Sequence, residues 1–234
     1  MATQKIDKVC FFTDEKGDNF HPLTLTRPLD DLRIGIYTIR EKWMRTLGIN
    51  RYARLMPEYL QGVFQKNEID TDEQVLWLNS RFLPSVKLTD QIKNLENNQC
   101  LVFNETCVAA FLDGEKSAQK FEENSFAHHD LDLIKSEDLI HLEHLWDLLS
   151  LNAYEIEKDI ALSAMKPVTE KSDDVKAEII NPENVYVADD MNIEPGVIIM
   201  ANEGPVVVME AATIEAGSII KGPVVIGKGA TVKM

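Results

Sequence analysis

The sequence has few cysteines and no pattern that would pair them. Its three cysteines, Cys10, Cys100 and Cys107, include no C-x-x-C motif and leave an odd number. We therefore expect reduced, buried thiols rather than a disulfide framework or a zinc site. The sequence also lacks an apolar export segment at its N-terminus and any apolar run of membrane-spanning length. These absences predict a cytoplasmic protein without membrane contact.

Positive charge is scarce as well. The chain has 24 Lys and Arg residues against 39 Asp and Glu, a formal net charge of −15. Binding along a nucleic acid needs a basic face, so the composition argues against DNA or RNA as a partner. A single nucleotide needs only a local cationic cluster and a divalent cation. One short stretch supplies such a cluster with Arg27, Arg33, Arg40 and Lys42.

The first 165 residues alternate strand patterns with helical patterns, which predicts a Rossmann-like α/β domain with a largely parallel sheet. The expected strands are Val9–Thr13, Val75–Leu78, Cys100–Phe103 and Val108–Phe111, the last two joined at Asn104-Glu105. The expected helices are Ile34–Leu47, Leu55–Gln61, Thr89–Asn97, a helix capped by Ser136 with Leu139, Leu142, Trp146 and Leu149 as its apolar stripe, and Asn152–Met165. A polar linker is predicted over 166–181.

The pattern changes in residues 182–234. Val208, Ile214, Ile220, Ile226 and Val232 lie six residues apart, and Gly-Pro-Val-Val at 204–207 recurs at 222–225. A six-residue period in threes predicts a triangular parallel β-helix, with a small insertion near residues 202–203. A two-stranded or sandwich arrangement is the alternative. The repeat is short and stops in mid-pattern, so we expect the front portion of a longer protein, unless its end is covered by the first domain or by another subunit.

Residues 22–28, PLTLTRP, match the second half of a phosphate-binding loop motif, and further matches follow at 32–43 and 78–84. With the Gly-Pro-Val-Val repeats, the chain resembles sugar-phosphate nucleotidyltransferases that carry a left-handed β-helix. It is similar in particular to a divergent family, typical of Bacteroidetes, proposed to replace the bifunctional UDP-N-acetylglucosamine pyrophosphorylase and glucosamine-1-phosphate acetyltransferase. The chain departs from the general motif, because its loop keeps only Gly17 and has Leu29 in place of a lysine.

The resemblance implies an enzyme that joins a nucleoside triphosphate and a sugar-1-phosphate with Mg²⁺ and releases pyrophosphate, most closely a maker of UDP-N-acetylglucosamine. It also implies a homotrimer assembled through the β-helix. The acetyltransferase site of such relatives would lie further along the β-helix than this chain extends. Two alternatives stay open: a non-catalytic sugar-nucleotide-binding or assembly module, and an acyltransferase whose front domain only recruits substrate.

The expected catalytic cations are Arg27, Arg33 and Lys42, since phosphoryl transfer depends on positioning and charge neutralisation. Ion pairs with Asp30 and Asp31 are the alternative for the arginines, and a solvated helix position is the alternative for Lys42. The expected substrate-binding residues are Gly17, Thr24, Thr26 and Asn79. The threonines can equally hold their own turn.

The resemblance places two residues beside a magnesium ion, Asn79 at the end of a strand and Asn152 between two helices. Neutral amides are poorer ligands for a hard cation than carboxylates, and a helix cap is the alternative for Asn152. Two histidine pairs, His128-His129 and His141-x-x-His144, lack the companions that a zinc site needs. We expect these histidines to be exposed or capping residues.

Overall fold

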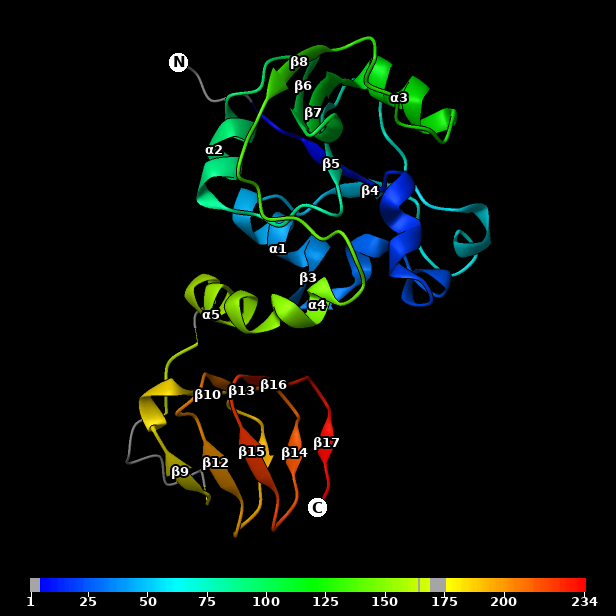
Figure 1. Ribbon diagram of the computed structural model, residues 1–234. Coiled ribbons are helices and arrows are strands. Elements are labelled where there is room, and N and C mark those ends of the chain that lie inside the picture. Colours follow the sequence, from blue (N-terminus) through cyan, green and yellow to red (C-terminus); the bar gives the residue numbers. More distant parts are fainter. Residues whose placement is uncertain (1–4, 164, 169–175) are drawn as a thin grey trace. The chain divides into compact units, whose positions relative to one another are not determined.

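The computed structural model describes residues 5–163, 165–168 and 176–234, and the chain divides into two compact units (Figure 1). Unit 1 contains the chain up to Arg33 and Tyr37–Leu148. Unit 2 contains Ile34–Ile36 and the chain from Leu149. The sequence predicted a first domain that ends at residue 165. In the structure, the last helix within that range belongs to unit 2 instead. Part of the predicted linker, 169–175, lies outside the described residues.

Unit 1 is built on a six-stranded sheet with the order β4-β1-β5-β7-β6-β8, in which only β7 runs antiparallel to its neighbours. The strands are β1 Lys8–Phe12, β4 Tyr52–Arg54, β5 Gln74–Asn79, β6 Gln99–Phe103, β7 Thr106–Asp113 and β8 Asp132–Lys135. The helices are α1 Ile39–Leu47, α2 Val86–Lys93 and α3 Gly114–Glu122. This confirms the predicted α/β layer with a mostly parallel, Rossmann-like sheet.

The hairpin between β6 and β7 turns where the sequence predicted. Asn104 and Glu105 have φ angles of 45° and 65°, as a tight two-residue turn between antiparallel strands requires. Both strands are buried in the sheet. Cys100 and Cys107 lie on them with their sulfur atoms 2.9 Å apart. All three cysteines are free and buried, which confirms the predicted burial of the thiols.

The predicted helix from Ile34 to Leu47 begins later than expected. Arg33–Ile34 (β2) and Tyr37–Thr38 (β3) form a small hairpin first, and Gly35 turns between them with a φ of 71°. Helix α1 starts after Thr38, whose hydroxyl accepts a hydrogen bond from the amide of Glu41 while the Glu41 carboxylate accepts one from the amide of Thr38. This capping box fixes the helix start and overrides the apolar spacing upstream.

The helix predicted from Ser136 is wrong. Residues 136–146 are not helical, and only the short α4, Asp147–Ser150, follows. Leu142 donates its amide to the carbonyl oxygen of Arg81 at 2.7 Å, and Leu83 donates to that of Ile140 at 3.1 Å. Pairing with a distant segment therefore overrides local helical spacing.

Other unit 1 predictions differ in extent. Helix α2 begins three residues before the predicted Thr89 because Ser85 caps it, and the predicted helix over Leu55–Gln61 is a single 3₁₀ turn, η4 Glu58–Leu60. Strands β4 and β8 and helix α3 were not predicted. Three further 3₁₀ turns follow β1, namely η1 Glu15–Phe20, η2 Leu23–Leu25 and η3 Leu29–Asp31.

Unit 2 contains the predicted helix, α5 Asn152–Leu162, and three parallel three-stranded sheets with the orders β10-β13-β16, β11-β14-β17 and β15-β12-β9. The strands are β9 Glu178–Ile180, β10 Val185–Val187, β11 Asn192–Ile193, β12 Ile198–Met200, β13 Val206–Val208, β14 Thr213–Ile214, β15 Ile219–Lys221, β16 Val224–Ile226 and β17 Thr231–Val232. Short parallel strands in three sheets are compatible with the predicted β-helix. Strand β9 lies inside the range predicted as linker.

The strand register of unit 2 explains the repeat in the sequence. Val185 pairs with Val206, and Val206 pairs with Val224, so the first step is three residues longer than the second. The extra residues fall in the first step, near the insertion expected at 202–203. A Cβ atom on Gly222 would collide with the carbonyl oxygen of Gly204, so the two Gly-Pro repeats stack too closely for a side chain at Gly222.

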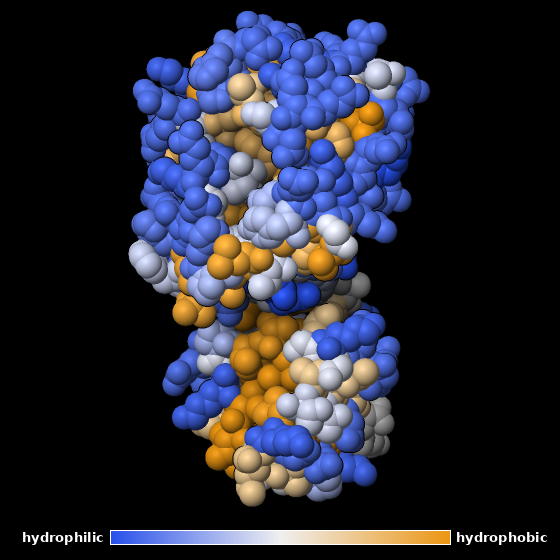
Figure 2. Space-filling view, turned by 90° about the vertical axis from the view of Figure 1, so that its right-hand side faces the viewer, coloured by the Kyte–Doolittle hydropathy of each residue, from blue (hydrophilic) through white to orange (hydrophobic). Residues whose placement is uncertain are grey.

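The surfaces of the two units differ in the view of Figure 2. The unit with the three small sheets carries a broad hydrophobic strip, whereas the other unit is mainly hydrophilic on this face. Exposed apolar side chains of unit 2 include Ile180, Ile219 and Met234. Continuous apolar surface of this kind marks places where proteins make contacts.

Candidate active site

A cleft of about 800 Å³ opens in unit 1 beside the carboxyl end of β1. Its lining comes from four separate segments: 12–29, 55–60, 105–107 and 124–129. The first segment follows β1, the second follows β4, and the third includes the start of the antiparallel β7, so all three lie at one edge of the sheet. Ligands of open α/β sheets bind at this edge.

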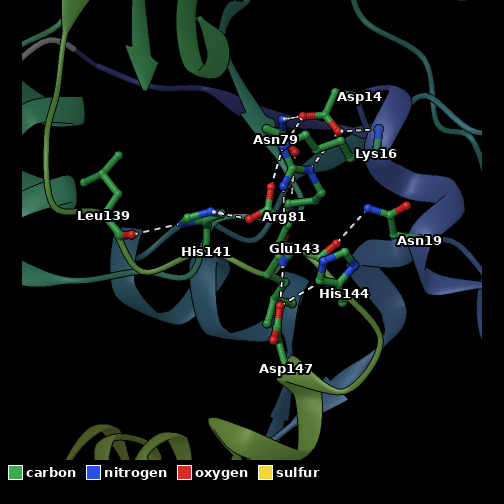
Figure 3. A network of polar contacts seen from close by, with 11 residues as sticks. Asp14, Lys16, Asn19, Asn79, Arg81, Leu139, His141, Glu143, His144 and Asp147 are labelled. Atoms are coloured by element: carbon green, nitrogen blue, oxygen red, sulfur yellow. Dashed lines mark hydrogen bonds and ion pairs between the residues drawn. The ribbon is translucent and has the colours of Figure 1, made fainter. Parts of the chain in front are cut away.

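Asp14 is the first charged residue after β1 and the most heavily hydrogen-bonded side chain of the cleft (Figure 3). Its Oδ1 accepts from Arg81 Nε at 2.7 Å and from the amide of Lys16 at 3.1 Å. Its Oδ2 accepts from Arg81 Nη2 at 2.6 Å and from Asn79 Nδ2 at 2.9 Å. Burial raises the pKa of Asp14, but the bonds from Arg81 and Asn79 outweigh it, and the net pKa lies below its ordinary value.

Arg81 and Asn79 are buried behind Asp14 rather than exposed in the cleft. Arg81 is only 1% exposed, and its Nη1 also donates to the carbonyl oxygen of Leu142 at 2.9 Å. Asn79 is the last residue of β5. Its side-chain nitrogen Nδ2 also donates to the carbonyl oxygen of Cys107, and its Oδ1 accepts from the backbone amide of Arg81 at 3.1 Å. These two side chains therefore fix the position of the Asp14 carboxylate.

A second set of contacts joins the loop after β1 to the segment around Glu143 (Figure 3). Lys16 forms an ion pair with the Glu143 carboxylate, and Asn19 Nδ2 donates to the Glu143 carbonyl oxygen at 2.9 Å. The Asp147 carboxylate accepts from the amides of Glu143 and His144 at 2.7 and 2.8 Å. The start of the cleft wall is thus anchored to residues far along the chain.

Three of the predicted site residues line the cleft: Gly17, Thr24 and Arg27. The Arg27 side chain is exposed and forms no hydrogen bond or ion pair with any described residue. The Thr24 hydroxyl is buried and has no hydrogen-bond partner within the described part of the chain. A free guanidinium and an unsatisfied hydroxyl on one short segment can both donate to a phosphate group. Gly17 is required by packing, since a Cβ there would collide with the Thr13 side chain.

The other predicted residues lie elsewhere. Thr26 donates its hydroxyl to the Leu23 carbonyl oxygen at 3.1 Å, so it holds its own turn. Arg33 is exposed in β2, while Lys42 is completely buried in α1, and neither is without a partner. Neither residue is part of the described cleft lining. The catalytic roles expected for Arg33 and Lys42 remain predictions.

Asp30 and Asp31, the expected alternative partners of Arg27 and Arg33, contact Arg40 and Arg54. Arg40 contacts Asp30 at 3.2 Å and Asp31 at 2.8 Å, and the buried Arg54 contacts Asp30 at 2.8 Å. Asp30 and Asp31, with which Arg27 was expected to pair if it did not bind phosphate, are therefore engaged by Arg40 and Arg54. Arg27 therefore keeps its charge free for a ligand.

The two residues predicted to bind magnesium do not fit that role as they lie here. The Asn79 side chain is fully buried, with both ends of its amide bonded to protein. Asn152 is in unit 2, at the start of α5, and its Oδ1 accepts from the amide of Gly35 at 2.9 Å. Among the described residues, no group of three or more His, Cys, Asp or Glu side chains is placed to hold a metal ion.

A sequence model of the sugar nucleotidyl transferases matches residues 9–166, which is most of unit 1 together with α5. The chain belongs to this family. Membership supports nucleotide-sugar formation and small-molecule substrates in general. A search of curated proteins finds no match. Within the described residues, no helix of this sugar nucleotidyl transferase is both long enough and apolar enough to span a membrane.

Two parts of the candidate site were not predicted from sequence. The first is the Asp14–Arg81 pair, for which the available signal was a charged residue directly after an apolar strand. The second is the wall formed by 124–129, which follows the unpredicted helix α3. No sequence pattern in residues 124–129 predicts that they line a cleft, because their position depends on where α3 places them.

Proposed function

We propose that this protein forms a nucleotide-sugar from a nucleoside triphosphate and a sugar-1-phosphate, with UTP and N-acetylglucosamine-1-phosphate as the favoured pair. The observation that carries the proposal is the free Arg27 guanidinium on the wall of a cleft at the carboxyl end of β1, with the unsatisfied hydroxyl of Thr24 on the same lining segment. The family match supports the reaction class. The choice of sugar and base rests on the sequence resemblance.

In the proposed reaction, an oxygen of the sugar phosphate attacks the α-phosphorus of the nucleotide and pyrophosphate leaves. Such a transfer needs positioned reactants and stabilised charge more than a protein nucleophile. Arg27 offers a bidentate fork to a phosphate, and the Thr24 hydroxyl is a second potential donor on the same segment. Asp14, held by Arg81 and Asn79, keeps the loop of the cleft wall in a fixed position.

Magnesium enters this proposal with the nucleotide. Mg²⁺ typically keeps several waters and is bound by substrate phosphates and one or two carboxylates. Carboxylates that line the cleft besides Asp14 are Glu15, Asp18 and Glu105. When bound, the ion would neutralise phosphate charge.

The test is release of pyrophosphate from UTP and N-acetylglucosamine-1-phosphate, measured with and without Mg²⁺ and alongside other nucleotides and sugar phosphates. Metal-dependent release with one pair would establish the reaction and identify its substrates. Folded protein that is silent across the whole panel would refute the proposal. If the same protein still bound UTP, the alternative of a sugar-nucleotide-binding module would replace it.

For unit 2 we propose a left-handed triangular β-helix that assembles a cytoplasmic homotrimer. Three parallel sheets with matching register support the β-helix, and the hydrophobic strip of Figure 2 supports assembly. Light scattering on the purified chain tests the trimer directly. A monomer at all accessible concentrations would contradict it.

A further inference from the structure

Within unit 1, the cleft wall formed by residues 124–129 packs against the side chains of β1 and β5. The Phe126 ring stacks on Phe12, with ring centroids 4.4 Å apart, and on Trp77 at 4.8 Å. The carbonyl oxygen of Ala127 accepts from Lys120 Nζ at 2.7 Å. A wall fixed at its middle by an aromatic cluster presents its neighbouring side chains in a defined place.

The next residue after the wall is a carboxylate that binds two lysines. Asp130 contacts Lys116 at 2.8 Å and Lys120 at 3.1 Å. The hydrogen bond from Lys116, helped by Lys120 and opposed by burial, lowers the pKa of Asp130 to about 2. Asp130 is therefore ionised at neutral pH, and both lysines are engaged by it instead of by a ligand.

Between these two anchors lie His128 and His129. Their rings stack with centroids 5.3 Å apart and an interplanar angle of 27°, and both residues line the cleft. His128 is half-buried and His129 is exposed. Neither imidazole forms a hydrogen bond or an ion pair in the part of the chain that the structure describes. Two imidazoles thus share one wall of the cleft, and their ring nitrogens have no protein partner among the described residues.

The charges of the cleft show what this pair can do. The proposed reaction brings in two substrates that each carry phosphate, and both must be neutralised. Lys16 is engaged by Glu143, and His21 lies 3.6 Å from Asp18. Among the described lining residues, Arg27, His128 and His129 are the basic side chains without a carboxylate partner. Arg27 can serve one phosphate, which leaves the pair for the other.

We propose that His128 and His129 form a second anion subsite of the cleft, which binds the phosphate of the sugar-1-phosphate and takes up a proton as it does so. This inference rests on the proposed function for the identity of its ligand. The subsite itself is a pair of imidazole donors on a fixed wall, and any tetrahedral dianion of suitable size probes it.

The proton uptake follows from the surroundings of the pair. Burial lowers the pKa of His128, and the charges of His129 and Lys120 lower it further, while Asp130 acts in the opposite direction. A bound dianion would favour the charged form of the imidazoles, so the affinity for the dianion should rise as pH falls. The other charged or titratable side chains that line the same cleft are Asp14, Glu15, Lys16, Asp18, His21, Arg27, Glu105, Cys107 and Tyr59.

The first experiment measures sulfate binding to the full chain by calorimetry, since sulfate remains a dianion throughout the range. We expect affinity to increase about fivefold from about pH 8 to about pH 6.5, and the pH dependence to be lost when His128 and His129 are both changed to Gln. His144→Gln is the matched control, because His144 stacks on Trp146 and is not among the described lining residues. Binding that is independent of pH, or unchanged in the double variant, overturns the subsite.

The second experiment separates the subsite from the proposed function. In the pyrophosphate-release assay at about pH 7, the double variant should raise KM for the sugar phosphate about tenfold and change KM for the nucleotide less than about twofold. Unchanged KM values in an active enzyme overturn the inference and leave the function standing. If no substrate pair reacts, the proposed function fails, and sulfate binding still decides the subsite.

If the double variant does not fold, histidine NMR of the unaltered protein gives the decision. Addition of sulfate should shift the imidazole resonances of His128 and His129 and leave those of His144 unchanged. Equal shifts at all three histidines, or none, overturn the proposal.

Discussion

Changing Arg81 to Met should destabilise unit 1 by about 3 kcal/mol at neutral pH. The substitution keeps most of the apolar stem and removes three side-chain donors, two to Asp14 and one to the Leu142 carbonyl oxygen. Breaking a buried ion pair costs roughly 3–5 kcal/mol. The Asp14 side chain is 23% exposed, so water can replace part of what Arg81 supplies, and we expect the lower end of that range.

Urea unfolding followed by tryptophan fluorescence measures this loss, because all three tryptophans lie in unit 1. The low native pKa of Asp14 means that its stabilising contribution is present above the ordinary pKa of an aspartate and is lost as pH falls through the native value. The difference between Arg81→Met and the unaltered chain should therefore narrow below about pH 4. Arg27→Met is the matched control, since exposed Arg27 has no partner among the described residues; it should change stability by less than about 0.5 kcal/mol.

A destabilisation by Arg81→Met below about 1 kcal/mol, or one equally large at low pH, would refute the reasoning. Either result would mean that the Asp14–Arg81 contact adds little once both groups are desolvated. Arg81→Lys refines the test, since lysine keeps the charge and loses the planar fork. The free energy of unfolding of Arg81→Lys should lie between those of Arg81→Met and the unaltered chain.

Three further outcomes are expected. Arg27→Ala should reduce kcat/KM for pyrophosphate release at least about tenfold, and unchanged kinetics would discard its role. Gly35→Ala should lower the free energy of unfolding of unit 2 by about 1–3 kcal/mol, because the φ of 71° is strained for alanine and the new Cβ would lie 2.5 Å from the Asp159 carboxylate; hydrogen exchange at α5 would report it, and unaltered protection would contradict it. The three buried thiols should react with a thiol reagent only as the protein unfolds; rapid labelling of native protein would show that they are accessible.

Four strands of unit 1 could be predicted because they are largely buried and therefore form continuous apolar runs. The segments that became β1, β5, β6 and β7 all had this character. Helix α3 could not be found in this way, since its sequence GEKSAQKFE has few apolar residues. Its position depends instead on close packing, for a Cβ on Gly114 would lie 2.5 Å from the Thr71 backbone.

The site was predictable only where one stretch of chain carries it. The motif at 22–28 led to Thr24 and Arg27, which both line the cleft. Asn79 was also expected to contact a ligand, yet it is buried and bonds to Asp14, which follows another strand, β1. A hydrogen bond between residues 65 positions apart is fixed by the order of β1 and β5 in the sheet, and the sequence of either strand alone does not contain it.

The turn at Ile34–Ile36 limits where the chain can be cut into fragments that fold. These three residues belong with α5, where Asn152 accepts the Gly35 amide and Asp159 accepts the Ile36 amide at 2.8 Å. A recombinant fragment ending at Leu148 would keep the turn and lose both acceptors, while the remaining fragment would keep a helix without the backbone that it binds. A fragment that contains the candidate site should therefore include α5, so that the turn at 34–36 keeps its two hydrogen-bond acceptors.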